Sequence, residues 1–251
     1  MLDRVAALST VQHSVAAEDI RVLNDVLRLV AKHRAHLLQN TILKELGPTV
    51  YAGPFRGMQF VSEVTEGCYV PKLLGCYEAE LHEHWESLIR RGYGHVVNVG
   101  CAEGYYAVGL AHRLPLARVH AFDIDPRGQQ TCRSLADQNG VGERVSVGAE
   151  FRLKDFRDYP PGDTLVLCDI EGAELELLDP VAEPSLKQLD LVVELHPHRS
   201  ASLPEEVLAR FADSHEITRV SHQQQTVELP DLFDRLGLGH LDRLLSLWSG
   251  A

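Results

Sequence analysis

VVNVGCAEGYYAVGLA, residues 96–111, joins an expected β-strand to an expected α-helix through a turn that begins at Gly100 and ends at Gly104. The residues before the turn are mostly apolar, as in a strand covered on both faces. After the turn, Ala107, Leu110 and Ala111 recur at helical spacing. Glycine lets the backbone pass close to a ligand, and the first N–H groups of a helix can hold an anion or a carboxylate. The stretch therefore predicts a ligand site at residues 100–104.

The same rhythm of strand and helix continues for the next hundred residues. Further strands are expected in RVHAFDID at 118–125, ERVSVGA at 143–149, DTLVLCDI at 163–170 and LDLVVELHP at 189–197, with helical segments at 127–138 and 172–178. HEITRVSHQQQTVEL at 215–229 suggests two more short strands. Alternating strands and helices form right-handed βαβ units. We therefore expect a doubly wound, Rossmann-like α/β fold with a mostly parallel seven-stranded sheet and helices on both faces.

Residues 1–74 are expected to form an extension to this domain, which would occupy residues 75–251. Residues 18–46 carry apolar side chains at helical spacing and end before Gly47-Pro48, which predicts one or two helices. Residues 49–67 favour short strands and turns, and residues 71–92 favour a helix that is capped by Gly92. The extension would cover the part of the site where a second substrate binds, or it would form a homodimer. The homodimer would use a stripe of Ile20, Leu23, Val26, Leu27 and Val30.

Charge and cysteine usage exclude several classes of protein. The chain has 251 residues, a formal net charge of −12 and no run of Lys or Arg, so we expect no nucleic-acid surface. Its five cysteines form no C-x-x-C pair, which suits a reducing cytosol better than a disulfide framework. No stretch approaches the ~18 apolar residues of a membrane span. We therefore expect a cytoplasmic protein that binds neither nucleic acid nor a membrane.

The glycine spacing limits which cofactor the turn can hold. A nicotinamide fingerprint needs G-x-G-x-x-G, but Ala102 stands at the second glycine position and Tyr105 at the third. The turn therefore suits a smaller, carboxylate-bearing cofactor better than a pyrophosphate. Asp123 follows the next strand, where a carboxylate accepts hydrogen bonds from ribose hydroxyls. Asp125 is better explained as the cap of the helix that starts at Pro126. Together, these residues predict a cofactor that contains a nucleoside.

Acidic residues and a histidine follow the fourth and fifth strands. Asp169 ends the fourth strand, and Glu171 and Glu174 begin the next helix, where acids suit the positive end of the helix dipole. We prefer that explanation for Glu174. Glu194 and His196 end the fifth strand, on the same sheet edge as the glycine turn. His196 either takes a proton from a hydroxyl nucleophile or is a loop histidine satisfied by the backbone. His196, Asp169 and Glu194 are the candidate catalytic residues.

Taken in order, NVGCAEG, AFDIDP, DIEGAE and ELHP resemble the motifs of the class I S-adenosylmethionine-dependent methyltransferases, and among them the FkbM-like group. That group typically shows a D-V-G-x-N-x-G turn, an acid after the second strand, then D-x-E-G-x-E and later E-x-H. The resemblance covers about residues 75–200, and DIEGAE is its most group-specific motif. It implies a Rossmann-like fold, S-adenosyl-L-methionine as the cofactor and methyl transfer as the reaction.

The resemblance also implies roles for individual residues. Gly100 and Gly104 would face the methionine part of the cofactor, Asp123 and Ile124 the ribose, and Gly148 with Ala149 the adenine. Enzymes of this group often methylate hydroxyls of sugars, polyketides or other natural products. Related sugar O-methyltransferases use a divalent metal such as magnesium to lower the pKa of the acceptor hydroxyl. Oxygen and imidazole ligands for such a metal would come from Asp169, Glu171, Glu194 and His196, and polar residues without a metal are the alternative.

Two positions depart from the pattern of this group. Asn98 stands where these enzymes usually carry an acid that reaches the methionine ammonium, and Asn accepts a hydrogen bond without the charge. Ala102 replaces the usual Asn or Gly. Glu103, or Glu78 from the preceding helix, would then supply the missing charge. These four residues and Asp169 complete the expected set of cofactor-binding residues.

We therefore expect an O-methyltransferase that acts on a hydroxyl of a small molecule. Three alternatives stay open. The acceptor atom can be nitrogen or carbon on the same fold, including an atom of a protein side chain. The chain can be a cofactor-binding module without catalysis, with Asn98 and Ala102 as signs of decay. It can also be an NAD-dependent oxidoreductase, which the glycine spacing disfavours.

Overall fold

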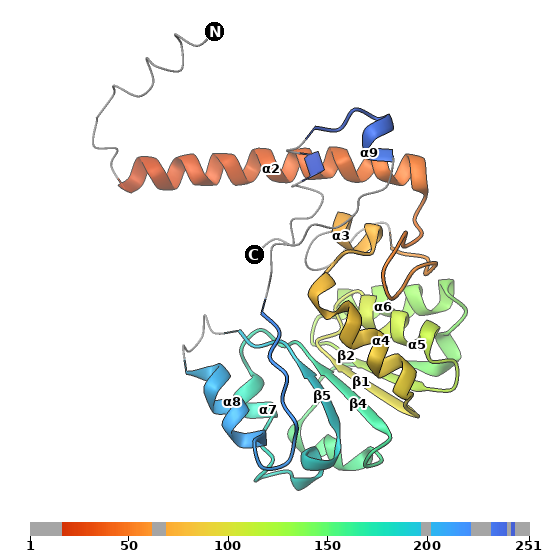
Figure 1. Ribbon diagram of the computed structural model, residues 1–251, viewed down its shortest axis with the longest axis vertical. Coiled ribbons are helices and arrows are strands. Elements are labelled where there is room, and N and C mark those ends of the chain that lie inside the picture. The colour runs from red at the N-terminus through yellow and green to blue at the C-terminus, as the bar shows by residue number, and fades with distance from the viewer. Residues whose placement is uncertain (1–16, 62–68, 197–201, 222–231, 240–241, 244–251) are drawn as a thin grey trace.

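The computed structural model describes residues 17–61, 69–196, 202–221, 232–239 and 242–243 (Figure 1). Five strands form its sheet: β1 (His95–Val99), β2 (Arg118–Phe122), β3 (Val145–Gly148), β4 (Thr164–Cys168) and β5 (Asp190–Val193). The main helices are α2 (Ala17–Leu46), α3 (Tyr69–Leu74), α4 (His82–Arg91), α5 (Tyr105–Arg113), α6 (Pro126–Gln138), α7 (Glu174–Leu177), α8 (Leu203–Phe211) and α9 (Leu232–Arg235). Short 3₁₀ turns at Ala79–Leu81, Gly142–Arg144, Leu153–Asp158 and Pro184–Gln188 connect them.

The sheet has the order β3-β2-β1-β4-β5, and every pair of neighbouring strands is parallel. The predicted α/β class and the parallel strands are thus confirmed. The predicted count of seven strands is not, because the described residues contain five. Residues 215–221, where the sixth strand was expected, form no strand, and residues 222–229 lie outside the described residues.

Alternating side chains of the central strands fill two separate cores. Val96 of β1 and Leu165 of β4 pack on one face of the sheet, in a cluster that includes Leu110 of α5. Val97 of β1 packs on the other face, in a cluster that includes Val207 of α8. Both faces are covered, which is why these strands are almost wholly apolar. The layers therefore confirm the expectation of helices on both sides of the sheet.

Two helix caps predicted from the sequence are present. The Asp125 side chain accepts a hydrogen bond from the Arg127 backbone N–H, and Pro126 occupies the first turn of α6. Gly92 ends α4 with a φ of 77°, in the range that favours glycine. The continuous helix predicted over residues 71–92 is wrong. It breaks at Gly75, where φ is 74° and a Cβ would lie 1.9 Å from the Ala52 carbonyl oxygen.

The extension contacts the domain through its middle rather than its start. Phe55 and Phe60 belong to the same buried cluster as Tyr105 of α5. Thr49 and Gln59 form one antiparallel bridge, in a segment for which short strands were predicted. α2 is a single helix, and its N-terminal half stands clear of the sheet and its covering helices (Figure 1). Within the described ranges, we find no helix with the length and apolar content that a membrane crossing requires.

Candidate functional site

The candidate site lies at the carboxyl edge of the sheet, around β1. From β1 the chain proceeds to β2 and β3 on one side, and later crosses to β4 and β5 on the other. Open α/β sheets bind ligands outside the strand ends at such a reversal point. The turn after β1, Asp123 after β2, Asp169 after β4 and Glu194 after β5 all follow these strand ends. The edge thus gathers most of the residues that the motifs predicted.

The turn after β1 is built from residues in left-handed conformations. The φ angles are 79° at Gly100, 46° at Ala102 and 93° at Gly104. A Cβ on Gly100 would lie 1.6 Å from the Asp169 carbonyl oxygen, and a Cβ on Gly104 would lie 2.7 Å from the Cys132 sulfur. Both glycines are therefore required by packing against neighbouring elements. This packing requirement is additional to the close approach of a ligand, for which the two glycines were predicted.

Asp123 secures this turn. Its Oδ2 accepts a hydrogen bond of 2.7 Å from the Ala102 backbone N–H, and its Oδ1 accepts one of 2.8 Å from the Asp125 N–H. A carboxylate has about four lone-pair sites, so these two bonds leave acceptor capacity for a ligand hydroxyl. The Asp123 N–H donates to the Gly148 carbonyl oxygen, which brings the end of β3 alongside. Ile124 is exposed next to Asp123, and Ala149 is exposed beyond Gly148.

Asn98 is the most unusual polar residue of the edge. It lies in β1, two residues before Gly100, and is 1 % exposed. Its Oδ1 is buried and has no hydrogen-bond partner among the described residues. A buried acceptor without a partner costs free energy, of the order of 1–3 kcal/mol. The structure therefore offers an acceptor for an N–H donor beside the glycine turn.

Glu103, inside the turn, forms a buried ion pair with the extension. Its Oε1 lies 2.5 Å from the Lys72 ammonium, and both side chains are almost fully buried. The same ammonium lies 4.9 Å from the centre of the Tyr77 ring. Glu103 was a candidate for the charge that Asn98 lacks. In the structure its carboxylate instead faces a lysine, which neutralises it.

Glu78, the second candidate for that charge, lies close to the carboxylates of the sheet edge. Tyr106 and Tyr77 hydrogen-bond to its side chain. Burial raises the pKa of Glu78, although these hydrogen bonds and the Lys72 ammonium oppose the rise. Its charge also contributes to the raised pKa of Glu194. Glu78 thus belongs to the acidic side of the site.

His196 stands at the centre of four carboxylates, within the last described residues after β5. Its Nδ1 lies 2.7 Å from Glu174 Oε1. Its Nε2 faces three other carboxylate oxygens, at 3.6 Å from Asp169, 3.7 Å from Glu171 and 3.7 Å from Glu194. A neutral imidazole that donates from Nδ1 presents a lone pair at Nε2, and a lone pair repels carboxylates. The arrangement therefore favours a proton or another cation between Nε2 and these oxygens.

The pKa values at this centre reflect the crowding of charge. Burial raises the pKa of Glu194 to about 8, and the nearby charges of Asp169 and Glu78 add to the rise. Burial lowers the pKa of His196, but the hydrogen bond to Glu174 and the charges of Glu194, Glu171 and Asp169 outweigh it, so the net shift is upward. Perturbed groups that cluster in this way are typical of functional sites.

Glu174 is the residue that sequence reasoning misjudged. The expected role was a favourable charge at a helix start, yet its side chain is fully buried and holds the His196 ring. Its Oε1 also accepts a hydrogen bond from the Gly172 N–H. Metal-binding histidines are usually supported in this way: a carboxylate holds one ring nitrogen, here Nδ1, while the other, here Nε2, faces the ligand cluster. The DIEGAE motif, which ends on Glu174, was the signal in the sequence that could have identified this residue.

The donor set around His196 Nε2 can hold a metal ion. Among the described residues, the ligand atoms of Asp169, Glu171 and His196 all lie within 4.8 Å of one another. Glu194 approaches the same nitrogen. Carboxylate oxygens with one imidazole suit hard or borderline divalent cations. The structure thus brings together the four residues that were predicted as ligands.

Comparisons with known proteins add the following. No family model matches the chain. Ribosomal protein L11 methyltransferase of Citrobacter koseri is 33 % identical over 82 residues, which cover 33 % of this chain and 27 % of that protein. Release factor glutamine methyltransferase of Chlorobaculum tepidum is 30 % identical over 151 residues, which cover 47 % of this chain and 51 % of that protein. The chain therefore spans between about a quarter and a half of the curated relatives it matches.

Two solved structures are similar to this chain over part of its length. The O-methyltransferase TomG from Streptomyces achromogenes, in complex with SAM, is 17 % identical, with a TM-score of 0.42 and coverage of 56 % of this chain and 68 % of that one. The O-methyltransferase from Bacillus cereus, in complex with SAH, is 14 % identical, with a TM-score of 0.39 and coverage of 51 % and 64 %.

Proposed function

We propose that this protein binds S-adenosylmethionine at the turn after β1 and transfers its methyl group to a hydroxyl of a small molecule. The observation that carries the proposal is the buried Asn98 oxygen, which has no hydrogen-bond partner among the described residues and precedes the glycine turn. The curated relatives are methyltransferases by name, which supports the same activity. The FkbM-like group is part of the proposal, on the strength of the DIEGAE and ELHP motifs.

The residues of the edge fit the parts of this cofactor. Asn98 Oδ1 can accept a hydrogen bond from the methionine ammonium, and the first N–H groups of α5 can hold the methionine carboxylate. Asp123 has acceptor capacity left for the ribose hydroxyls. Gly148 and Ala149, at the end of β3 beside Asp123, are the proposed neighbours of the adenine. When bound, the cofactor supplies an electrophilic methyl group, so the protein has only to align the acceptor and exclude water.

His196 is the proposed base for the acceptor hydroxyl. Its Nδ1 is fixed by Glu174, so Nε2 is the nitrogen that can take a proton from an acceptor. In the metal-assisted form of the reaction, Nε2 would be a ligand instead of the base, and a divalent metal held by Asp169, Glu171, Glu194 and His196 would lower the pKa of a bound hydroxyl. These residues fit such an ion, because their oxygens and Nε2 converge without a cationic side chain among them. The extension would cover the acceptor, and the protein would act in the cytoplasm.

A second candidate follows from the same carboxylates. Glu78, Asp169, Glu171 and Glu194 also make the site attractive to a cationic acceptor, such as an amine, without any metal. The reaction would then be N-methylation, and the amine would have to lose its proton before attack. Turnover with a hydroxyl or with an amine acceptor distinguishes the two candidates, and chelation would stop only the metal-assisted form of the first.

Titration calorimetry tests cofactor binding directly. We expect S-adenosylmethionine and S-adenosylhomocysteine to bind, and NAD to give no heat, because the turn lacks the second and third glycines that a pyrophosphate needs. Release of S-adenosylhomocysteine is then followed with hydroxylated and amine acceptors, with and without EDTA. Absence of binding by S-adenosylmethionine would refute the proposal. Binding without turnover across both panels would favour a module without catalysis.

Glu174→Gln tests whether the support of His196 matters. The change keeps the size of the buried side chain but removes its charge. The hydrogen bond to Nδ1 is then weaker, because its acceptor is neutral. We expect kcat to fall by about 10- to 100-fold while KM for the cofactor stays the same. Glu176→Gln is the matched control, since Glu176 is exposed on the same short helix. Equal activity of the two variants would show that Glu174 has no positioning role.

A further inference from the structure

The N-terminal half of α2 carries an apolar face that no described element covers. Every residue from 20 to 30 is exposed. Seven of them are large and apolar, with exposed fractions from 48 % at Ile20 to 69 % at Leu29. Helical geometry places the seven on one half of the circumference, and the charged residues on the other half. The apolar residues are Ile20, Val22, Leu23, Val26, Leu27, Leu29 and Val30, and the charged ones are Arg21, Asp25, Arg28 and Lys32.

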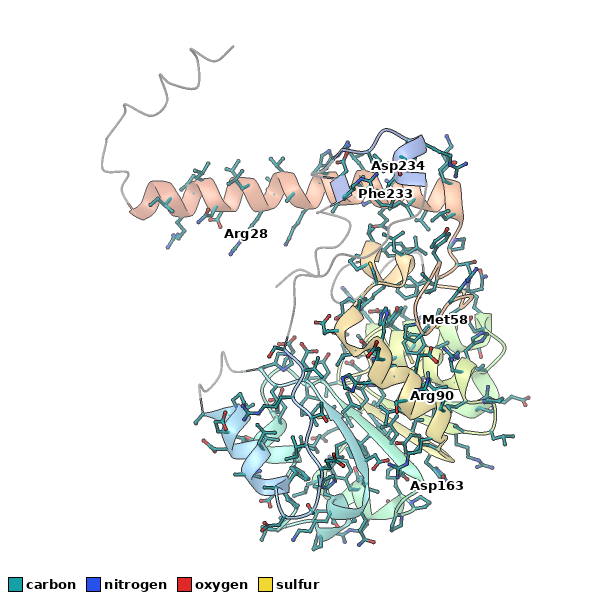
Figure 2. All side chains as sticks on the ribbon, in the orientation of Figure 1. Arg28, Met58, Arg90, Asp163, Phe233 and Asp234 are labelled. Atoms are coloured by element: carbon teal, nitrogen blue, oxygen red, sulfur yellow. The ribbon has the colours of Figure 1, made fainter. Side chains whose placement is uncertain are left out.

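The C-terminal half of the same helix is already occupied. Leu38 and Ile42 are buried against the body, and Arg34 forms a hydrogen-bonded ion pair with Asp242 at 2.7 Å. Figure 2 shows Phe233 beside this half, while Arg28 lies on the half that has no such neighbour. Among the described residues, the packing of α2 on its own domain therefore ends near Arg34. It does not explain the apolar residues that precede it.

We propose that residues 20–30 of α2 pack against the same residues of a second copy of this chain. Seven side chains of this kind expose on the order of 700 Å² together, close to the about 800 Å² that each partner buries in a standard interface. A lone amphipathic helix of this length is marginal in water, so a covering partner also stabilises the helix. A two-fold axis lets one face serve as both halves of the interface.

A membrane or another part of the same chain fits the apolar face of α2 less well than a second copy. Membrane-bound helices of this type usually carry aromatic residues on the apolar face, and none of the seven residues is aromatic. The net charge of −12 also opposes contact with an anionic bilayer. The segment 244–251 of the chain itself lies outside the described residues, and its removal is therefore one arm of the test.

Sedimentation velocity of the full chain at micromolar concentrations tests the proposal. We expect the wild type to sediment with the mass of two chains, and the double variant Leu27→Glu/Val30→Glu with the mass of one. Leu116→Glu is the matched control, because Leu116 is 92 % exposed between α5 and β2 and should leave the dimer intact. Thermal unfolding is recorded for each variant to show that the domain still folds, and the double variant is expected to unfold at a somewhat lower midpoint because it loses the partner that covers α2.

The other outcomes overturn the proposal. A wild-type monomer, or a dimer that survives the double substitution, would mean that α2 does not pair with a second copy. A monomer that dimerises once residues 244–251 are removed would show that the chain covers its own helix. A monomer that floats with anionic vesicles would assign the face to a membrane.

Discussion

His196→Ala lowers kcat by about 10²- to 10⁴-fold and leaves the affinity for S-adenosylmethionine unchanged, if His196 is the base. The reason is geometric. The ring is fixed through Nδ1 by Glu174, and Nε2 is the atom that faces the carboxylates of the edge. Removing the ring takes away the proton acceptor, but Asn98 and the glycine turn are untouched. Cofactor affinity is measured by calorimetry, and turnover by release of S-adenosylhomocysteine.

Two controls separate this effect from general damage. His84→Ala removes an exposed histidine of α4 and should keep full activity. His196→Gln keeps a polar side chain beside Glu174 and should protect the folded state better than Ala, while activity stays low. A His196→Ala enzyme with nearly normal kcat would exclude the base. It would direct attention to a nitrogen acceptor that needs no such group.

Gly100→Ala should destabilise the protein by about 4 kcal/mol, since it combines strained backbone with overpacking. Its φ is 79°, and the added Cβ would lie 1.6 Å from the Asp169 carbonyl oxygen. Backbone atoms of β4 cannot move aside as a flexible side chain would. The turn and the end of β4 would therefore shift apart, and cofactor binding should be lost together with stability. Urea unfolding and calorimetry measure the two effects.

Gly57→Ala is the matched control for this substitution. Gly57 also has a positive φ, of 92°, but a Cβ there meets no atom within 4 Å. Only the backbone strain remains, which costs roughly 1–2 kcal/mol. The difference between the two variants isolates the clash with Asp169. Equal stability of both would mean that the turn can relax, and that Gly100 is not needed for packing.

Much of the fold could be predicted, because it depends on local patterns. The apolar strands predicted a parallel sheet, and Asp125 and Gly92 mark helix ends through bonds within a few residues. The break at Gly75 could not be foreseen in the same way. It depends on the approach of Ala52, more than twenty residues earlier in the chain. The sixth strand was wrong because residues 215–221 pair with no strand, although their composition resembles one.

The candidate site shows the same division. Position along the sequence was enough to gather Asp123, Asp169 and Glu194 at one edge, since parallel strands end together. It was not enough for Glu174, whose side chain contacts His196, 22 residues later. Nor did spacing reveal that Glu103 would meet Lys72. A long-range contact changes the meaning of an acidic residue, and such contacts appear only in the folded chain.

The pairing of Lys72 with Glu103 has a consequence for how the molecule opens. Tyr106 also bonds to Glu78, and Arg113 donates to the Pro54 carbonyl oxygen, so α5 and the turn before it are joined at three points to residues 54–78. Separating them would strip the lysine from a fully buried carboxylate, which is a costly step. Amide hydrogens of these segments should therefore exchange with solvent as one cooperative unit. The first 74 residues differ from the rest in sequence rhythm, but their latter part is expected to unfold together with the turn after β1.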